Sequence, residues 1–290
     1  MSAKVVWQTK SPIVLESFKQ KKITSIIKGG NVYNFQAAIA LAMKFDVTID
    51  ESAIKQDYHN VLKYYLRHRL NTPQADVTVK ENYPVVVGAI NKNSKNIALI
   101  HHIDKINSGQ SYGHKVFFVE LFRKLRKMDL VITVSEYWKI FLEEHGCKNV
   151  KVIYNSFVPE DYKIEQNDVV EFKKKYSIPD RPIVYIGNAH KQKGVYEAYN
   201  ALKGLDVELI MTEAQNMASD LPVRFLSLSR KEFITLLHAS EVVVLMSKLM
   251  EGWNRVAHEA LLCNTPVVGS GTGGMGELLT KSKQIITTNE

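Results

Sequence analysis

The stretch Glu-Gly-Trp-Asn-Arg-Val-Ala-His-Glu-Ala-Leu-Leu-Cys-Asn-Thr-Pro-Val-Val-Gly, residues 251–269, decides the fold of this chain. An apolar run at 242–246 precedes it and predicts a buried strand. After a turn at its start, the stretch continues as an amphipathic helix, which must end before Pro266. Residues 266–269 predict a second short strand. Strand, loop, helix and strand in this order form one unit of a parallel sheet.

The same alternation of strands and helices extends through the rest of the chain. A length of 290 residues favours two domains, and the polar segment 158–166, which contains Pro159, is the predicted linker. The domains are then 1–157 and 167–290. In the first, we expect strands at 5–7, 23–27, 45–49, 85–90 and 97–100 and helices at 31–43, 58–70 and 113–128.

Composition excludes several classes of protein. Hydrophobic residues make up 45% and charged residues 23%, as in ordinary globular domains. No apolar run approaches the ~18 residues of a membrane span, and the first residues lack the apolar core of a signal peptide. Two distant cysteines, Cys147 and Cys263, favour reduced thiols in a cytoplasmic protein.

The net charge of +8 favours an anionic partner, which could be nucleic acid, an acidic membrane surface or a phosphorylated substrate. The charge alone does not choose among these. Two predicted helices are basic, and if their charges face outward together they suit peripheral contact with anionic lipid or a lipid phosphate. A solvated basic face is the alternative. The residues are Lys63, Arg67, Arg69, Arg123, Lys124, Arg126 and Lys127.

Two carboxylates in the opening stretch carry a resemblance to a known family. Glu251 and Glu259 form Glu-x7-Glu between two strands, followed by Pro-Val-Val-Gly and by Gly273-Gly274-x-x-Glu277. This pattern resembles the donor-site signature of the family 4 (group 1) retaining glycosyltransferases. The resemblance implies an α/β fold of GT-B type, in which two Rossmann-like domains have parallel sheets facing a central cleft. It also implies a nucleotide-diphosphate sugar as donor substrate, a glycan or lipid-linked acceptor, and no further cofactor.

The resemblance also implies roles for individual residues of the stretch. Glu259 takes the position whose carboxylate accepts from the two ribose hydroxyls, and Glu251 the position near the donor sugar. The loop of Trp253, Asn254, Arg255 and Val256 has backbone N–H groups that would contact the sugar and β-phosphate. Asn254 replaces a usual glycine, and asparagine tolerates left-handed backbone angles better than most residues.

A basic loop follows the first strand of the second domain. Lys193-Gly194 matches the Lys-Gly pair that faces the donor diphosphate in the family, and an ammonium beside free backbone N–H groups suits phosphates. The family's arginine is replaced by Asn188, and Lys191 or His190 could supply its charge. No Asp-x-Asp occurs, so we expect no metal site, with the cation's role falling to Lys193, Arg255 and helix N-termini.

Two features of the first domain are further candidates. Gly29-Gly30 precedes a predicted helix, where a backbone can approach a phosphate or simply turn. The sequence His101-His102-x-Asp104 follows a buried strand, at the edge where ligands bind in such sheets. The resemblance implies that one histidine contacts the donor sugar, and we favour His102 over His101.

The leading prediction is therefore a retaining, metal-independent glycosyltransferase. A non-catalytic subunit that binds a nucleotide sugar or a partner protein is the alternative, because the arginine is missing. An NAD-linked oxidoreductase is disfavoured by the absence of Gly-x-Gly-x-x-Gly. Nucleic-acid binding rests on charge alone and is not favoured.

Overall fold

The computed structural model describes residues 2–22, 29–50, 74–103, 112–212, 218 and 220–287. The chain divides into two compact units, Met1–Ser156 and Phe157–Glu290. The predicted strand at 23–27, the predicted helix at 58–70 with its basic residues, and Asp104 lie outside the described residues. No helix within the described ranges is long and apolar enough to span a bilayer.

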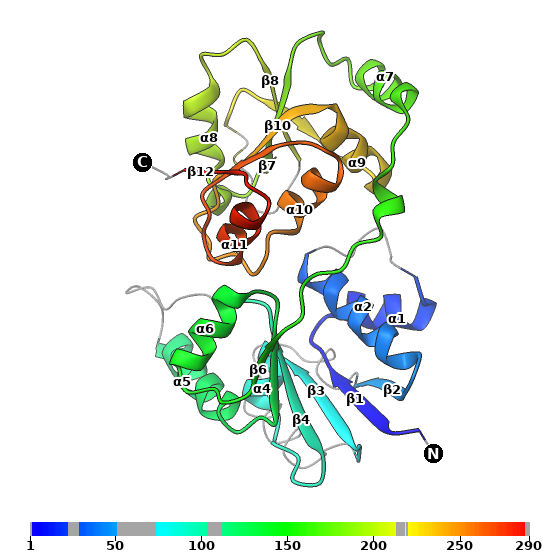
Figure 1. Ribbon diagram of the computed structural model, residues 1–290, viewed down its shortest axis with the longest axis vertical. Coiled ribbons are helices and arrows are strands. Elements are labelled where there is room, and N and C mark those ends of the chain that lie inside the picture. Colours follow the sequence, from blue (N-terminus) through cyan, green and yellow to red (C-terminus); the bar gives the residue numbers. More distant parts are fainter. Residues whose placement is uncertain are drawn as a thin grey trace. The chain divides into compact units, whose positions relative to one another are not determined.

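The first unit contains a parallel sheet with the strand order β2-β1-β3-β4-β5-β6 (Figure 1). Its buried strands are rich in β-branched residues, which suit a sheet covered on both faces. The strands are β1 (Lys4–Gln8), β2 (Asp46–Asp50), β3 (Val77–Glu81), β4 (Lys95–Ile100), β5 (Leu130–Thr133) and β6 (Val150–Val152).

The helices of the first unit connect these parallel strands. Helices α1 and α2 pack against each other, and α4 packs against α5. The described helices are α1 (Pro12–Gln20), α2 (Gly30–Ala42), α4 (Asn82–Val87), α5 (Tyr112–Leu125) and α6 (Glu136–Glu144).

The strand predicted at 85–90 was wrong, because residues 85–87 form the end of helix α4, and the strand is β3, just before this helix. The run Val85-Val86-Val87 is fully buried, and a short buried run looks the same in a strand and a helix. Pro84 lies in the first turn of α4, where the lack of an N–H costs little, and Gly88 follows the last turn.

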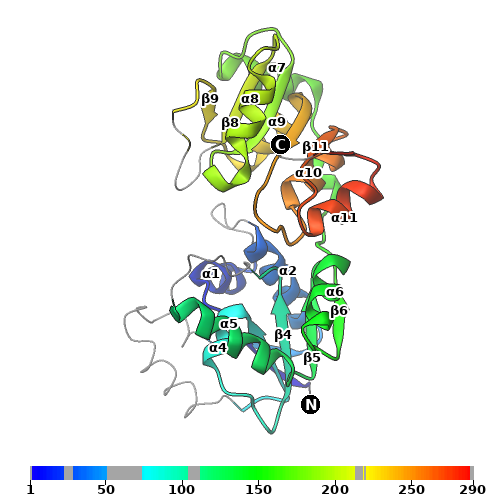
Figure 2. The same ribbon diagram turned by 90° about the vertical axis from the view of Figure 1, so that its left-hand side faces the viewer.

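The second unit contains another parallel sheet, with the strand order β12-β11-β10-β7-β8-β9. Its strands are β7 (Ile183–Asn188), β8 (Glu208–Thr212), β9 (Arg224–Leu226), β10 (Ser240–Leu245), β11 (Val267–Gly269) and β12 (Ile285–Ile286). The helices are α7 (Gln166–Lys175), α8 (Val195–Leu202), α9 (Arg230–Ala239), α10 (Arg255–Leu262) and α11 (Gly274–Lys281). Helix α8 lies on one face of this sheet, and α9 and α10 pack together on the other (Figures 1 and 2). The predicted unit of strand, helix and strand around residues 251–269 is confirmed as β10, α10 and β11.

The segment expected as a linker begins the second unit instead of standing apart from it. Residues Pro159–Tyr162 form the short 3-10 helix η3, which contacts α10, and the Tyr162 side chain is buried. An apolar aromatic ring inside a polar segment is the sequence feature that accounts for this packing.

Each sheet has one point where the strand order reverses. In the first unit, β1 lies between β2 and β3. The strand that follows β1 in the chain, β2, is therefore on one side of it, and the next strands, from β3 onwards, are on the other side. In the second unit, β7 lies between β8 and β10 in the same way. Ligands of open parallel sheets bind beyond the carboxyl ends of the strands at such a point.

Candidate functional site

The carboxyl ends of β7 and β10 meet at the loop that carries Lys193. This residue ends η4 (Lys191–Lys193), and Gly194 follows with a φ of 69°. A Cβ at position 194 would lie only 1.7 Å from the carbonyl oxygen of Met246. The loop after β7 therefore packs directly on the backbone at the end of β10, which is possible only for glycine.

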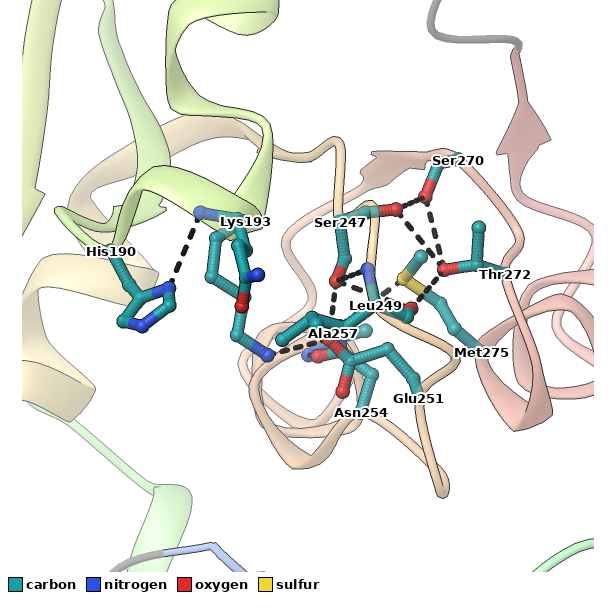
Figure 3. Close-up of polar contacts among 11 residues, drawn as sticks. His190, Lys193, Ser247, Leu249, Glu251, Asn254, Ala257, Ser270, Thr272 and Met275 are labelled. Atoms are coloured by element: carbon teal, nitrogen blue, oxygen red, sulfur yellow. Dashed lines mark hydrogen bonds and ion pairs between the residues drawn. The ribbon is translucent and has the colours of Figure 1, made fainter. Parts of the chain in front are cut away.

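Lys193 and Glu251 form an ion pair at this place. Lys193 Nζ lies 2.5 Å from Glu251 Oε1, and Ser247 Oγ donates to the same oxygen at 2.7 Å (Figure 3). The Lys193 side chain keeps 31% of its surface exposed and that of Glu251 13%. The structure thus brings together two residues that lie 58 positions apart in sequence. A cation and a carboxylate are both presented at the point where the strand order reverses.

The loop that carries Glu251 is held by the segment after β11. Gly274 N donates to Glu251 O at 2.8 Å, and Thr272 Oγ1 donates to Leu249 O at the same distance (Figure 3). A Cβ at Gly273, which has a φ of 62°, would lie 2.4 Å from Glu251 O. The Gly273-Gly274 pair therefore allows two backbone segments to pack closely. This contact fixes the backbone of Glu251, from which its carboxylate extends.

Asn254 begins helix α10 in a left-handed conformation, with a φ of 65°. Its Oδ1 accepts from Ala257 N at 3.0 Å, so the side chain caps the helix. The neighbouring Trp253 side chain is buried and donates from Nε1 to His258 Nδ1 at 3.0 Å. Burial and the nearby Arg255 cation lower the pKa of His258, which keeps the ring neutral and able to accept.

A second cluster surrounds Glu259 on α10. Only 5% of the surface of Glu259 is exposed. Arg230 Nη2 donates to Glu259 Oε1 at 2.9 Å, and the hydroxyl of Tyr162 donates to it at 3.2 Å. Burial, and secondly the Glu259 charge, raise the pKa of Tyr162, so its hydroxyl keeps its proton. None of the described residues donates to the other oxygen, Oε2. Protein groups therefore orient the carboxylate through Oε1, and Oε2 can accept a hydrogen bond from a ligand.

The other donor-site residues predicted in this unit are Arg255, Asn188 and Val256. Arg255 belongs to the second cluster: its guanidinium lies 4.3 Å from the ring centre of Phe157 and 3.8 Å from Glu259 Oε1. Asn188 is exposed at the end of β7, and Val256 is half-buried in the first turn of α10.

In the first unit, the structure distinguishes the two candidate histidines. His101 is half-buried, and its Nε2 lies 2.7 Å from Asn34 Oδ1. His102 is exposed, and its carbonyl accepts from Asn82 Nδ2. Gly30 makes room for the His101 ring, since a Cβ there would lie 3.3 Å from Cδ2 of that ring. Gly29 has a φ of 57°, and no atom of the described residues lies within 4 Å of the position that a Cβ would take there.

One of the basic residues expected to face outward does not do so. Lys124 is buried, and its Nζ donates to Val86 O at 2.5 Å and Gly88 O at 2.6 Å, at the C-terminal end of α4. Helix C-termini attract cations, which explains this burial. The other basic residues at the end of α5, Arg123, Arg126 and Lys127, are exposed.

Sequence reasoning missed two residues of the second cluster, Tyr162 and Arg230. The only sequence signal near Arg230 is the capping box of Ser229 and Glu232, which marks the start of α9. That signal places a helix end but does not show which side chain reaches Glu259, 29 residues further along the chain.

Comparison with known proteins connects this geometry to a family. Residues 180–290 match the family model of Glycosyl transferases group 1. This part of the chain is therefore similar to the group 1 glycosyl transferases. An uncharacterized glycosyltransferase of Methanocaldococcus jannaschii is 27% identical over 175 residues, which cover 51% of this chain and 44% of that protein. N-acetyl-alpha-D-glucosaminyl L-malate synthase of Bacillus anthracis is 25% identical over 175 residues, with coverages of 53% and 45%. The chain therefore matches less than half the length of these relatives.

Solved structures extend the likeness of the glycosyl transferase domain to the whole chain. HepE of Anabaena, in complex with UDP-glucose, has a TM-score of 0.68 and 19% identity, covering 99% of this chain and 85% of its own. Sucrose-phosphate synthase of Thermosynechococcus elongatus has a TM-score of 0.76 and 15% identity, with coverages of 99% and 86%. The predicted α/β fold of GT-B type, with two Rossmann-like sheets, is confirmed.

Proposed function

We propose that this protein is a retaining, metal-independent glycosyltransferase, which moves a sugar from a nucleotide-diphosphate sugar to a glycan or lipid-linked acceptor. The observation that carries the proposal is the ion pair of Lys193 and Glu251 at the reversal point of the second sheet. A donor of this kind carries a diphosphate and a sugar with several hydroxyls. Lys193 supplies charge for the first, and Glu251 supplies acceptor oxygens for the second.

Glu259 suits the ribose of the same donor. Arg230 and Tyr162 both hold Oε1, which leaves Oε2 to accept from a ribose hydroxyl. Because Arg230 and Tyr162 already orient the carboxylate, the contact would be made with little loss of side-chain freedom on binding. The presence of UDP-glucose in HepE supports testing UDP-sugars first.

In the proposed reaction, the acceptor hydroxyl attacks the anomeric carbon on the face from which the nucleotide leaves. The bond between that carbon and the diphosphate oxygen breaks, and the departing phosphate takes the proton of the acceptor hydroxyl. Negative charge therefore grows on the leaving phosphate, next to the place where Lys193 is presented. Preorganised cationic and backbone N–H groups stabilise such charge without needing a metal ion.

A second candidate function is that of a nucleotide-sugar-binding subunit without turnover. The observation that favours it is the exposed Asn188 at the end of β7, where the group 1 pattern has an arginine. This candidate and the enzyme differ in what happens to the bound donor, because only the enzyme releases the nucleoside diphosphate.

We also propose that the protein is cytoplasmic and makes peripheral contact with anionic membranes. The exposed residues Arg123, Arg126 and Lys127 would make this contact. Each basic residue near such a surface contributes about 1 kcal/mol. Co-sedimentation with vesicles of neutral and of anionic lipid tests this, and equal binding to both would contradict it.

The experiment that tests the function has two stages. A thermal-shift screen of UDP-, GDP-, ADP- and CMP-sugars finds the donor, because a ligand that binds the folded state raises Tm. Release of the nucleoside diphosphate is then measured with glycan and lipid acceptors. A raised Tm without release, across all acceptors, would favour the binding subunit, and no shift with any sugar nucleotide would contradict both functions.

A further inference from the structure

Two loops of the second unit carry the charged groups of the first cluster. The β7 loop, residues 189–194, follows β7, contains Lys193 and leads directly into α8. The β10 loop, residues 246–254, follows β10, contains Glu251 and leads into α10. Both loops start at the carboxyl ends of neighbouring strands, so how they are held against each other decides how the two charges are presented.

Two ion pairs of opposite direction connect these segments. Lys193 of the β7 loop pairs with Glu251 of the β10 loop. Lys248 of the β10 loop pairs with Glu197, which lies in the first turn of α8, directly after the β7 loop. Each side thus contributes one lysine and one glutamate. Only the first pair takes part in the donor chemistry proposed above.

Lys248 is also connected to both partners of the first pair through its neighbours. Its backbone N–H donates to Gln192 O at 3.0 Å, and Gln192 directly precedes Lys193. On the other side, the preceding residue, Ser247, donates from Oγ to Glu251 Oε1 at 2.7 Å. A movement of the backbone at Lys248 would therefore change the positions of both the Lys193 ammonium and the Glu251 carboxylate.

The Glu197 carboxylate has its compensating charge from Lys248. Its side chain is 27% exposed, and its Oε2 atom is buried with no hydrogen-bond partner in the part of the chain that the structure describes. Burial, the largest influence, raises the pKa of Glu197, but hydrogen bonds from Lys248 and its own backbone, together with the Lys248 charge, hold this pKa below its usual value. A partly buried carboxylate that loses its cation is costly, so this pair should hold more firmly than one at the open surface.

A bound donor would act on the first pair and not on the second. In the proposed reaction the diphosphate is a second anion for Lys193, and it competes with Glu251 for the ammonium. We infer that Lys248 and Glu197 are positioning residues, whose ion pair holds the β7 and β10 loops together while Lys193 and Glu251 act on the donor. The effect on catalysis rests on the proposed function, whereas the attachment of the two loops does not.

The first test needs no substrate. Hydrogen exchange of the amide at position 248 is measured by NMR in the full chain, because this N–H bridges the two loops. Lys248→Met and Glu197→Gln each remove one charge of the pair, and in both we expect this amide to exchange about tenfold faster, through easier local opening. The double variant Lys248→Glu with Glu197→Lys has opposite charges again and should recover most of the protection.

Lys231→Met is the matched control. Lys231 on α9 pairs with Asp168 on α7 at 2.7 Å, outside both loops. These two side chains are 68% and 29% exposed, compared with 51% and 27% for Lys248 and Glu197. Exchange at position 248 should therefore stay as in the wild type. Unchanged exchange in folded Lys248→Met and Glu197→Gln proteins, or a double variant that exchanges as fast as either of them, would overturn the inference.

The second test uses transfer kinetics with UDP-glucose, or with the sugar nucleotide that raises Tm in the thermal-shift screen. Lys248→Met should lower kcat about tenfold, as expected for slightly misplaced reacting groups, while the KM for the donor changes less. The double charge reversal should recover most of the rate, whereas a pair with a structural role alone would lower Tm and leave kcat unchanged.

The two tests separate the inference from the proposed function. If the amide exchanges as predicted but the wild type transfers no sugar, the proposed function fails and the attachment of the loops stands. If the wild type transfers sugar and a folded Lys248→Met protein has wild-type kcat, the catalytic part of the inference is wrong.

Discussion

Arg230 Nη2 lies 2.9 Å from Glu259 Oε1, so the first residue of α9 orients a carboxylate in the middle of α10. The Arg230 side chain is half exposed, whereas that of Glu259 is 6% exposed. The arginine therefore provides a compensating charge for a carboxylate that water hardly reaches. Removing one partner of such a pair leaves a poorly solvated charge.

We predict that Arg230→Ala weakens binding of the donor about tenfold or more and lowers Tm, because Glu259 loses its strongest hydrogen bond. Isothermal titration and thermal unfolding measure the two effects. Lys231→Ala is the control, since Lys231 is exposed and pairs with Asp168 on α7. That variant should change stability by no more than about 0.5 kcal/mol. Equal behaviour of the two variants would contradict the role given to Arg230.

Gly194 gives a prediction about the join between β7 and β10. Gly194→Ala should destabilise the protein by about 3 kcal/mol or more, because its Cβ would overlap the Met246 carbonyl and its φ is left-handed. Gly204→Ala is the matched control, because within the part of the chain that the structure describes no atom lies within 4 Å of its Cβ position. Urea denaturation of both variants measures the difference, and a Gly194→Ala protein as stable as Gly204→Ala would refute this packing.

Burial raises the pKa of Glu81 from 4.5 to about 7. Between these values the folded state binds more protons than the unfolded state, so this group makes the free energy of unfolding fall as pH rises. At about 1.4 kcal/mol per pKa unit, the loss between pH 4.5 and pH 7 is about 3 kcal/mol. In Glu81→Gln this contribution should disappear. Denaturation of both proteins across this pH range tests the prediction, and parallel stability curves would contradict it.

We expect transfer to be independent of divalent metal ions. In the proposed reaction the charge on the leaving diphosphate is met by Lys193, and the sequence contains no Asp-x-Asp. Rates measured in excess EDTA should equal those measured with Mg²⁺ or Mn²⁺. A large loss in EDTA that Mn²⁺ restores would rule out the mechanism proposed for the leaving group.

Local sequence signals predicted the parts of the fold that depend on neighbouring residues. The apolar run at 242–246 and the helix stop at Pro266 both act within a few residues, and β10, α10 and β11 follow them. The strand predicted at 85–90 failed for the converse reason. A run of buried valines reports burial, and the tertiary context decides between strand and helix.

The site was predictable only where a motif carries its own spacing. Glu251, Glu259 and Lys193 were predicted this way, and their roles in donor binding stay predictions. Tyr162 and Arg230 were missed because their link to Glu259 spans 97 and 29 residues and depends on how α9, α10 and η3 pack. The contact that distinguishes His101 from His102 joins His101 to Asn34, 67 residues away, and so could not be predicted from local sequence either.

The central claim is that Lys193, Glu251 and Glu259 form one donor site, and steady-state kinetics of three variants tests it most directly. Glu259→Ala should raise the donor KM about 10- to 150-fold, for a loss of about 1.5–3 kcal/mol, with kcat nearly intact, because the ribose contact is the same before and during reaction. Glu251→Gln and Lys193→Ala should mainly lower kcat, because they act where the bond breaks and charge builds up. If all three variants are folded and keep the wild-type kcat and KM, the donor does not bind here.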